Sequence, residues 1–205
     1  MKKTIIVFVL WLSMGNLSWA QNDASPSKEL PKIQESSKPA VIWQTDQAFT
    51  KQLGEDVAIG KFFLRPPKEY FLTKLDSPEG TLILTWRGEM RSDQTFPHLI
   101  ATIVVQSKEE KQSYQSKEAL KILLAGIEKN RNAWKASMPQ EGKSNGVEVV
   151  RSYWNGTDKA SGKKIKGFIY VLVDEKTIIN LASQDTIENE GALKLAEAAV
   201  LTFHK

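Results

Sequence analysis

The sequence of 205 residues contains no cysteine. This absence excludes disulfide bonds, cysteine nucleophiles, thiolate metal sites and lipid attachment through cysteine. A chain without disulfides must be held together by its hydrophobic core, and about 165 residues can bury roughly 70% of the surface that the unfolded chain exposes. We therefore expect a single domain at residues 41–205, with its core at about 57–205.

Histidine is also scarce. The two histidines, His98 and His204, are far apart in the sequence, and neither belongs to a His-x-x-x-His pair. A Gly-x-Ser-x-Gly nucleophile motif is missing, and the Gly142-Lys143-Ser144 string lacks the earlier glycine of a phosphate-binding loop. The sequence thus predicts no catalytic residue, no metal site and no cofactor.

One acidic cluster precedes the last expected helix, at Asp185, Glu188 and Glu190. Paired carboxylates can carry out acid–base chemistry. Acidic residues are also common at the start of a helix, where they interact favourably with the helix dipole. We favour the second interpretation and leave the first as an alternative.

The sequence also lacks a large excess of positive or negative charge. The net charge of +4 includes Lys2 and Lys3, and without them 26 basic side chains face 24 acidic ones. This small excess argues against nucleic-acid binding. A local excess occurs at Lys159, Lys163 and Lys164, in the loop NGTDKASGKKI. These lysines are interpreted either as a solvated hairpin loop or as a contact with an anionic surface or an envelope protein.

Long hydrophobic runs are confined to the first twenty residues, MKKTIIVFVLWLSMGNLSWA. A short basic start, an apolar middle and small residues at Ser18 and Ala20 are typical of a secretory signal peptide. The apolar part, at about ten residues, is too short to span a bilayer comfortably. We predict cleavage between Ala20 and Gln21 and a secreted or periplasmic protein. Residues 21–40 are rich in serine, proline and lysine, which predicts a flexible linker.

The rest of the chain alternates apolar and polar residues with the period of β-strands. Strands are expected at 58–65, 70–74, 81–87, 98–106, 147–154, 166–174 and 177–184. Helices are expected after Asp46, from Ser116 to about Trp134 with Leu124 on its buried stripe, and at about 187–203. Several strands are apolar on both faces and therefore need cover on both. The pattern predicts an α+β fold: a largely antiparallel sheet of about six to seven strands, flanked by helices on both faces.

This order of elements resembles the Mog1/PsbP-like α/β/α fold family. The resemblance rests on FFLRPPKEYF, a later long helix, NGVEVVRSYW, GFIYVLV and the DEKTIINLASQD hairpin, and it covers about three quarters of the chain. It also extends to small secreted bacterial proteins of the same pattern. Known members of this fold mostly act as non-catalytic binding or assembly factors, and the resemblance implies such a role. None of their binding motifs is matched here.

The double proline in FFLRPPKEYF raises two possibilities. Proline fixes its own backbone and cannot donate a hydrogen bond, so Pro66 and Pro67 predict a stiff corner between two strands. Alternatively, both prolines could join aromatic side chains in an exposed apolar rim that binds a partner. That rim would consist of Pro66, Pro67, Tyr70, Trp86 and Trp154.

Together these features predict an exported, non-catalytic domain of the cell envelope that binds or scaffolds a partner. Two alternatives stay open: a small cofactor-independent hydrolase or lyase, and a carrier of a small apolar ligand.

Overall fold

The computed structural model describes residues 41–76, 80–105 and 115–205. The predicted signal peptide (1–20) and linker (21–40) lie outside the described residues. Within these ranges, no helix is long and apolar enough to cross a membrane.

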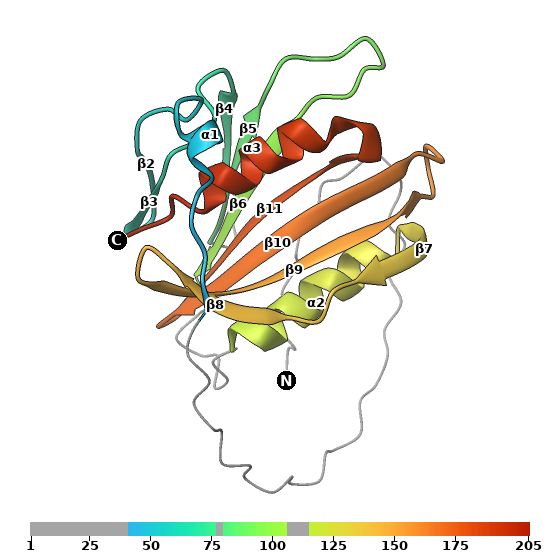
Figure 1. The fold of residues 1–205 in the computed structure, drawn as a ribbon. Helices are drawn as coiled ribbons and strands as arrows, with labels where there is room; N and C mark the ends of the chain where they lie inside the picture. The colour runs from blue at the N-terminus through green and yellow to red at the C-terminus, as the bar shows by residue number, and fades with distance from the viewer. Residues whose placement is uncertain (1–40, 77–79, 106–114) are drawn as a thin grey trace, which may run out of the picture. The chain divides into compact units, whose positions relative to one another are not determined.

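A large, almost wholly antiparallel sheet dominates the fold (Figure 1). Eight of its nine strands follow the order β1-β8-β9-β10-β11-β6-β5-β4, and the ninth, β7, pairs with β9. The strands are β1 (Val41–Ile42), β4 (Phe71–Asp76), β5 (Thr81–Arg87), β6 (His98–Val105), β7 (Arg131–Ala136), β8 (Gln140–Ser144), β9 (Val147–Asp158), β10 (Lys164–Asp174) and β11 (Thr177–Thr186). Only β1 is parallel to its neighbour. The expected antiparallel sheet is therefore present, with more strands than the six to seven expected.

The described residues contain fewer helices than strands. They are α1 (Gln47–Thr50), α2 (Ser116–Glu128), the 3-10 turn η1 (Ile187–Asn189) and α3 (Glu190–Val200). Asp46 caps α1 as expected, because its Oδ1 accepts a hydrogen bond of 2.9 Å from the Ala48 amide. Helix α2 contacts β7, β9 and β10, and α3 contacts β10 and β11. Helices on both faces of the sheet stay a prediction.

The main core lies between α3 and the sheet. Phe168, Tyr170 and Leu172 alternate along β10 and are buried in one cluster with Ala196 and Ala199 of α3. Alanines on this side of α3 allow the helix to approach the strands closely. The intervening β10 residues are buried as well, so this strand is apolar on both faces, as its sequence indicated.

The long helix expected up to Trp134 ends earlier. Helix α2 stops at Glu128, and Trp134 belongs to strand β7. Arg131 accounts for the change, because its buried guanidinium is 2.6 Å from Asp158 of β9 and draws this segment onto the sheet. Leu124 is only half-buried, whereas Leu120, Leu123 and Ile127 form the buried stripe.

The expected strand at 58–65 is instead a separate two-stranded hairpin, β2 (Val57–Ile59) and β3 (Phe62–Leu64). Gly60 makes the turn possible, since its φ of 64° lies in the left-handed region. Phe62 and Leu64 are buried and Phe63 is exposed, which confirms the predicted alternation.

Candidate functional site

Helix α3 presents four side chains, spaced along its length, on one of its faces. Glu190, Leu193, Lys194 and Glu197 follow the i, i+3, i+4, i+7 spacing that places side chains above one another on a helix. This face lies beside the one that carries the buried alanines. Its side chains therefore reach toward β9 and β10 at the margin of the core.

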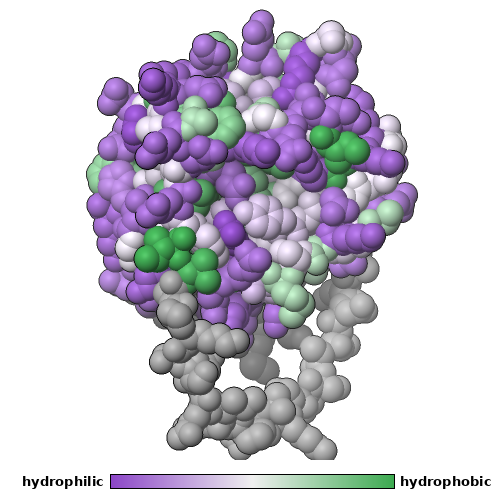
Figure 2. All heavy atoms as spheres, viewed as in Figure 1, coloured by the Kyte–Doolittle hydropathy of each residue, from purple (hydrophilic) through white to green (hydrophobic). Residues whose placement is uncertain are grey.

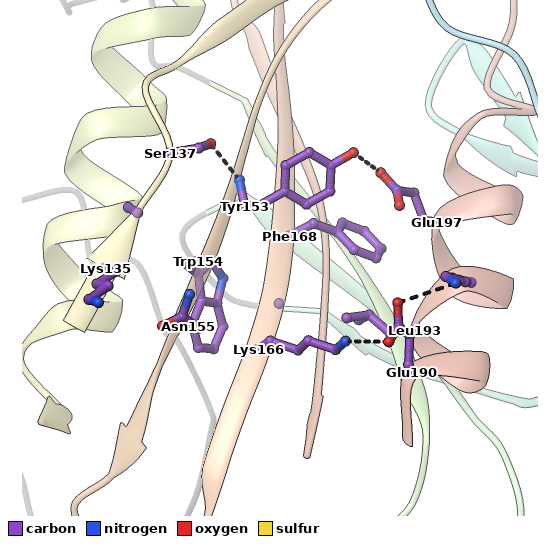
Figure 3. Close-up of a pocket in the computed structure, with 13 residues that line it drawn as sticks. Lys135, Ser137, Tyr153, Trp154, Asn155, Lys166, Phe168, Glu190, Leu193 and Glu197 are labelled. Atoms are coloured by element: carbon purple, nitrogen blue, oxygen red, sulfur yellow. Dashed lines mark hydrogen bonds and ion pairs between the residues drawn. The ribbon is translucent and has the colours of Figure 1, made fainter. Parts of the chain in front are cut away.

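A cleft of about 450 Å³ lies along this helix face. Figure 3 shows α3 on one side and strands β7, β9 and β10 on the other. The lining residues are Lys135, Ala136, Ser137, Tyr153, Trp154, Asn155, Lys166, Gly167, Phe168, Glu190, Leu193, Lys194 and Glu197. Figure 2 shows a paler central area on this face, framed by hydrophilic side chains. Such a volume lies within the usual range of ligand pockets, about 300–1,000 Å³.

One end of the cleft, here called the inner end, is built around Glu197. Both Tyr153 and Tyr170 donate their hydroxyl protons to Glu197 Oε1, and the Tyr170 bond is 2.7 Å long. Arg151 Nη1 lies 3.8 Å from the same oxygen and donates a bond of 2.9 Å to the Tyr170 hydroxyl. The Arg151 guanidinium also stacks on Trp43, 4.0 Å from the ring centre. Glu197 is thus fixed by two hydroxyl donors and one cation.

The inner end keeps its tyrosines neutral. Burial, followed by the hydrogen bond to Glu197, raises the pKa of Tyr153 to about 12. Burial and the negative charge of Glu197 raise the pKa of Tyr170 further still. Both effects disfavour a phenolate beside a carboxylate. Both hydroxyls therefore act as hydrogen-bond donors over the whole physiological pH range.

The opposite end, here called the outer end, is an exposed ion-pair network. Lys166 of β10 reaches across to Glu190 with Nζ 3.1 Å from Oε2, and Lys194 lies 3.2 Å from Oε1 (Figure 3). Hydrogen bonds from these two lysines, Lys166 first, lower the pKa of Glu190. The Glu190 side chain is 55% exposed. Exposed pairs of this kind contribute little net free energy, about 0–1 kcal/mol in general.

Between the two ends the floor is aromatic. Phe168 and Trp154 are almost fully buried, and Trp154 stacks on Trp134 with ring centres 5.4 Å apart. Opposite Trp154 stands Gly167, where an added Cβ would lie 2.6 Å from the indole and 2.6 Å from the Ser183 carbonyl oxygen. The absence of a side chain at Gly167 therefore lets the Trp154 ring lie flat across β10.

Lys135 and Asn155 are exposed polar residues of the cleft. Neither side chain makes a hydrogen bond or ion pair with the other residues that the structure describes. Ser137, in contrast, interacts with Ser152 at 3.2 Å and accepts a bond from the Tyr153 amide. Two side chains of the cleft are thus available to a ligand without breaking existing contacts.

The residues of the apolar rim considered in the sequence do not form an exposed surface, and binding of a partner by them stays a prediction. Pro66, Pro67, Trp86 and Trp154 are all buried, and Tyr70 is half-buried. The corner packs inward, because the Gly54 amide donates to the Pro66 carbonyl oxygen at 2.7 Å and Pro67 pairs with Leu53. These residues stabilise the fold, and only Trp154 also lines the cleft.

The lysines of the β9–β10 loop are less available than their number suggests. Lys163 is paired with Asp93 at 2.8 Å, and Lys159 donates to the carbonyl oxygen of Lys129. Lys164 is exposed and opens β10. Contact of Lys159, Lys163 and Lys164 with an anionic partner stays a prediction, supported most directly by Lys164.

The acidic cluster at 185–190 is divided between three elements. Asp185 lies next to the end of β11, where its carboxylate receives two hydrogen bonds of 2.8 Å from Arg91. Burial raises the pKa of the neighbouring Tyr70 to about 12. Glu188 lies in η1 and Glu190 begins α3. The interpretation as helix-start acids fits Glu188 and Glu190, but Asp185 serves a buried ion pair.

Most residues of the cleft were not recognised in the sequence as site residues. They come from four segments, at 135–137, 153–155, 166–168 and 190–197, which only the sheet brings together. One signal was present, namely the acidic residues Glu190 and Glu197 two helical turns apart, with Leu193 between them. Amphipathic spacing alone does not say which strands face such a helix.

The comparisons with known proteins support the fold. No protein-family model and no curated protein matches this chain. Among solved structures, it is similar to the solution structure of cyanobacterial PsbP (CyanoP) from Synechocystis sp. PCC 6803. The TM-score is 0.51 at 9% sequence identity, over 73% of this chain and 91% of that one. The chain therefore has a PsbP-like fold, as its sequence indicated.

Proposed function

We propose that this protein is an exported, non-catalytic binding domain of the cell envelope, and that its ligand occupies the cleft between α3 and strands β7, β9 and β10. One observation carries the proposal: the cleft combines a ligand-sized volume and an aromatic floor with acidic groups already bound by internal donors. The resemblance to PsbP is in keeping with a binding role, but it carries the fold alone.

Binding is favoured over hydrolysis or elimination by the state of the two carboxylates. A general acid or base needs a pKa near the working pH and access to a substrate proton. Glu197 already accepts from Tyr153 and Tyr170, and the lysines lower the pKa of Glu190. Both carboxylates are thus already engaged by donors of the protein. They suit a site that orients a ligand better than one that exchanges protons with it.

Binding in the cleft can be tested with the neutral fluorescent probe N-phenyl-1-naphthylamine. We expect the probe to bind the folded wild-type protein with saturable fluorescence enhancement. Leu193→Trp should fill the cleft and abolish the enhancement, because Leu193 lines it and is only half-buried. Ile122→Trp, at an exposed position on α2, serves as the control and should bind normally. Equal enhancement in both variants would place binding elsewhere and reject the cleft.

Export is proposed from the first twenty residues and can be tested separately. Mass spectrometry of protein recovered from the envelope fraction of the expressing cell should give a mature chain that begins at Gln21. Recovery of a chain that still contains residues 1–20 would contradict the proposed processing, whatever the result for the cleft.

A further inference from the structure

The outer end of the cleft shows which chemical group it accommodates. Glu190 places one carboxylate between two ammonium groups, 3.1 Å from Lys166 and 3.2 Å from Lys194. Glu190 belongs to the protein, but its carboxylate occupies the position that the headgroup of a ligand would take. We propose that the cleft binds an amphipathic carboxylate, an apolar chain or ring bearing one carboxylate, whose headgroup replaces Glu190 between Lys166 and Lys194. This inference rests on the proposed function.

The charges around the cleft favour an anion. Three lysines line it, Lys135, Lys166 and Lys194, and the Lys135 side chain has no partner among the described residues. Of the two lining carboxylates, Glu197 is balanced by Arg151 at 3.8 Å and by two hydroxyl donors. Once Glu190 is displaced, the outer end carries uncompensated positive charge. Such a field attracts an anion into a site with apolar walls.

The apolar part of the ligand has a matching surface. Leu193 projects from α3 toward Phe168 and Trp154 on the sheet, between the two charged ends (Figure 3). Removing an alkyl chain from water is favourable, and the gain grows with each CH₂ group that is buried. A ligand with its carboxylate at Lys166 can thus direct its apolar part along Phe168 and Leu193 toward the inner end.

Glu190 is suited to be displaced. Its side chain is 55% exposed, and it is the first residue of α3. The next residue is Gly191, and nothing lies within 4 Å of a Cβ added there, so there is open space beside Glu190 at the start of the helix. Exposed ion pairs exchange partners at low cost in free energy. The inner end lacks this freedom, because Tyr153, Tyr170 and Arg151 hold Glu197 from three directions.

The test compares dodecanoate with its neutral counterpart dodecanol, both below their aggregation concentrations, by displacement of N-phenyl-1-naphthylamine at pH 8. We expect dodecanoate to bind at least tenfold more tightly than dodecanol to the wild-type protein. Lys166→Gln should weaken dodecanoate binding about tenfold and leave dodecanol unchanged. Lys176→Gln, in the exposed turn after β10, is the matched control and should change neither affinity.

The Glu190→Gln variant gives the sharpest result. Removal of the internal carboxylate frees Lys166 and Lys194, so dodecanoate should bind three- to tenfold more tightly than to the wild type. If Glu190 only supported the fold, its loss would weaken binding or leave it unchanged, and the inference would be overturned. Circular dichroism confirms that each variant is folded, and Lys194→Gln replaces Lys166→Gln if that variant is not.

The outcomes separate the inference from the proposed function. Equal affinities for dodecanoate and dodecanol, with no response to Glu190→Gln, would reject the inference that the ligand carries a carboxylate. The proposal that the cleft binds a ligand would stand. Failure of both compounds and of the neutral probe would reject both proposals. Loss of dodecanoate affinity in 0.5 M NaCl, with dodecanol unaffected, would support the anionic headgroup, because salt screens exposed charges.

Discussion

The two ends of the cleft are made from similar parts but differ in their chemistry. Each end has a glutamate of α3 that contacts the sheet across the cleft. At the inner end, Glu197 meets two tyrosine hydroxyls and a stacked arginine, all half-buried or buried. At the outer end, Glu190 meets two lysines, of which Lys194 is exposed and Lys166 is half-buried. The comparison teaches that the surroundings of a carboxylate, more than its position on a helix, decide whether it stabilises the fold or can yield to a ligand.

The largest expected effect is at the inner end. Glu197→Ala leaves the Tyr153 and Tyr170 hydroxyls without their shared acceptor and the Arg151 guanidinium without its nearby carboxylate. Leaving buried donors unsatisfied costs about 1–3 kcal/mol, so we expect the free energy of unfolding to fall by about 2–3 kcal/mol. Urea denaturation followed by circular dichroism measures the change. An unchanged midpoint would show that Glu197 is as dispensable as an exposed residue and would remove the contrast between the two ends.

A smaller effect is expected at high pH. The pKa of Tyr153 is raised to about 12 in the folded protein, from an unfolded value near 10. The unfolded chain therefore loses this proton first, and the stabilisation present below pH 10 is lost as the pH rises toward 12. Discounted for partial exposure, the loss is on the order of 1 kcal/mol. Denaturation midpoints between pH 9 and 11.5 should fall less steeply for Tyr153→Phe than for the wild type. Equally steep curves for the two proteins would contradict the raised pKa of Tyr153.

The smallest effect is expected at the outer end. Glu190→Gln should leave the urea midpoint unchanged, because the Glu190 side chain is more than half exposed and ion pairs of exposed carboxylates contribute little net free energy. Moderate salt should likewise have no more effect on the wild type than on this variant. A clear loss of stability in Glu190→Gln would mean that the outer end fixes α3 after all, and it would argue against displacement by a ligand.

Much of the fold was predictable because local signals agreed with the final structure. The strand at Thr81–Arg87 has the expected bounds, and the tight turn after Asp174 predicted the β10–β11 hairpin. Long apolar strands and short turns specify their own pairing. These parts required no knowledge of distant residues.

The parts that were not predictable depend on distant partners. Strand β8 has the polar sequence QEGKS, which carries no strand signal, and it forms because β9 supplies the backbone hydrogen bonds. Trp134 matched a helical spacing by coincidence, and the buried Arg131–Asp158 pair overrode it. The cleft depends on the same long-range pairings, so its residue set could not be read from any single segment.

The parallel pairing of β1 with β8 has a consequence for the order in which parts of the protein fold during synthesis. Val41 and Ile42 pair with Gly142 and Lys143, about a hundred positions later, and the next residue, Trp43, lies beneath Arg151. A polypeptide emerges with its N-terminus first, so β1 has no neighbour until β8 has been made. Arg151 in turn reaches Glu197 only when the last helix is present. Strand β1 therefore pairs late although it is made early. The contacts around Glu197 at the inner end form only after helix α3 has been synthesised.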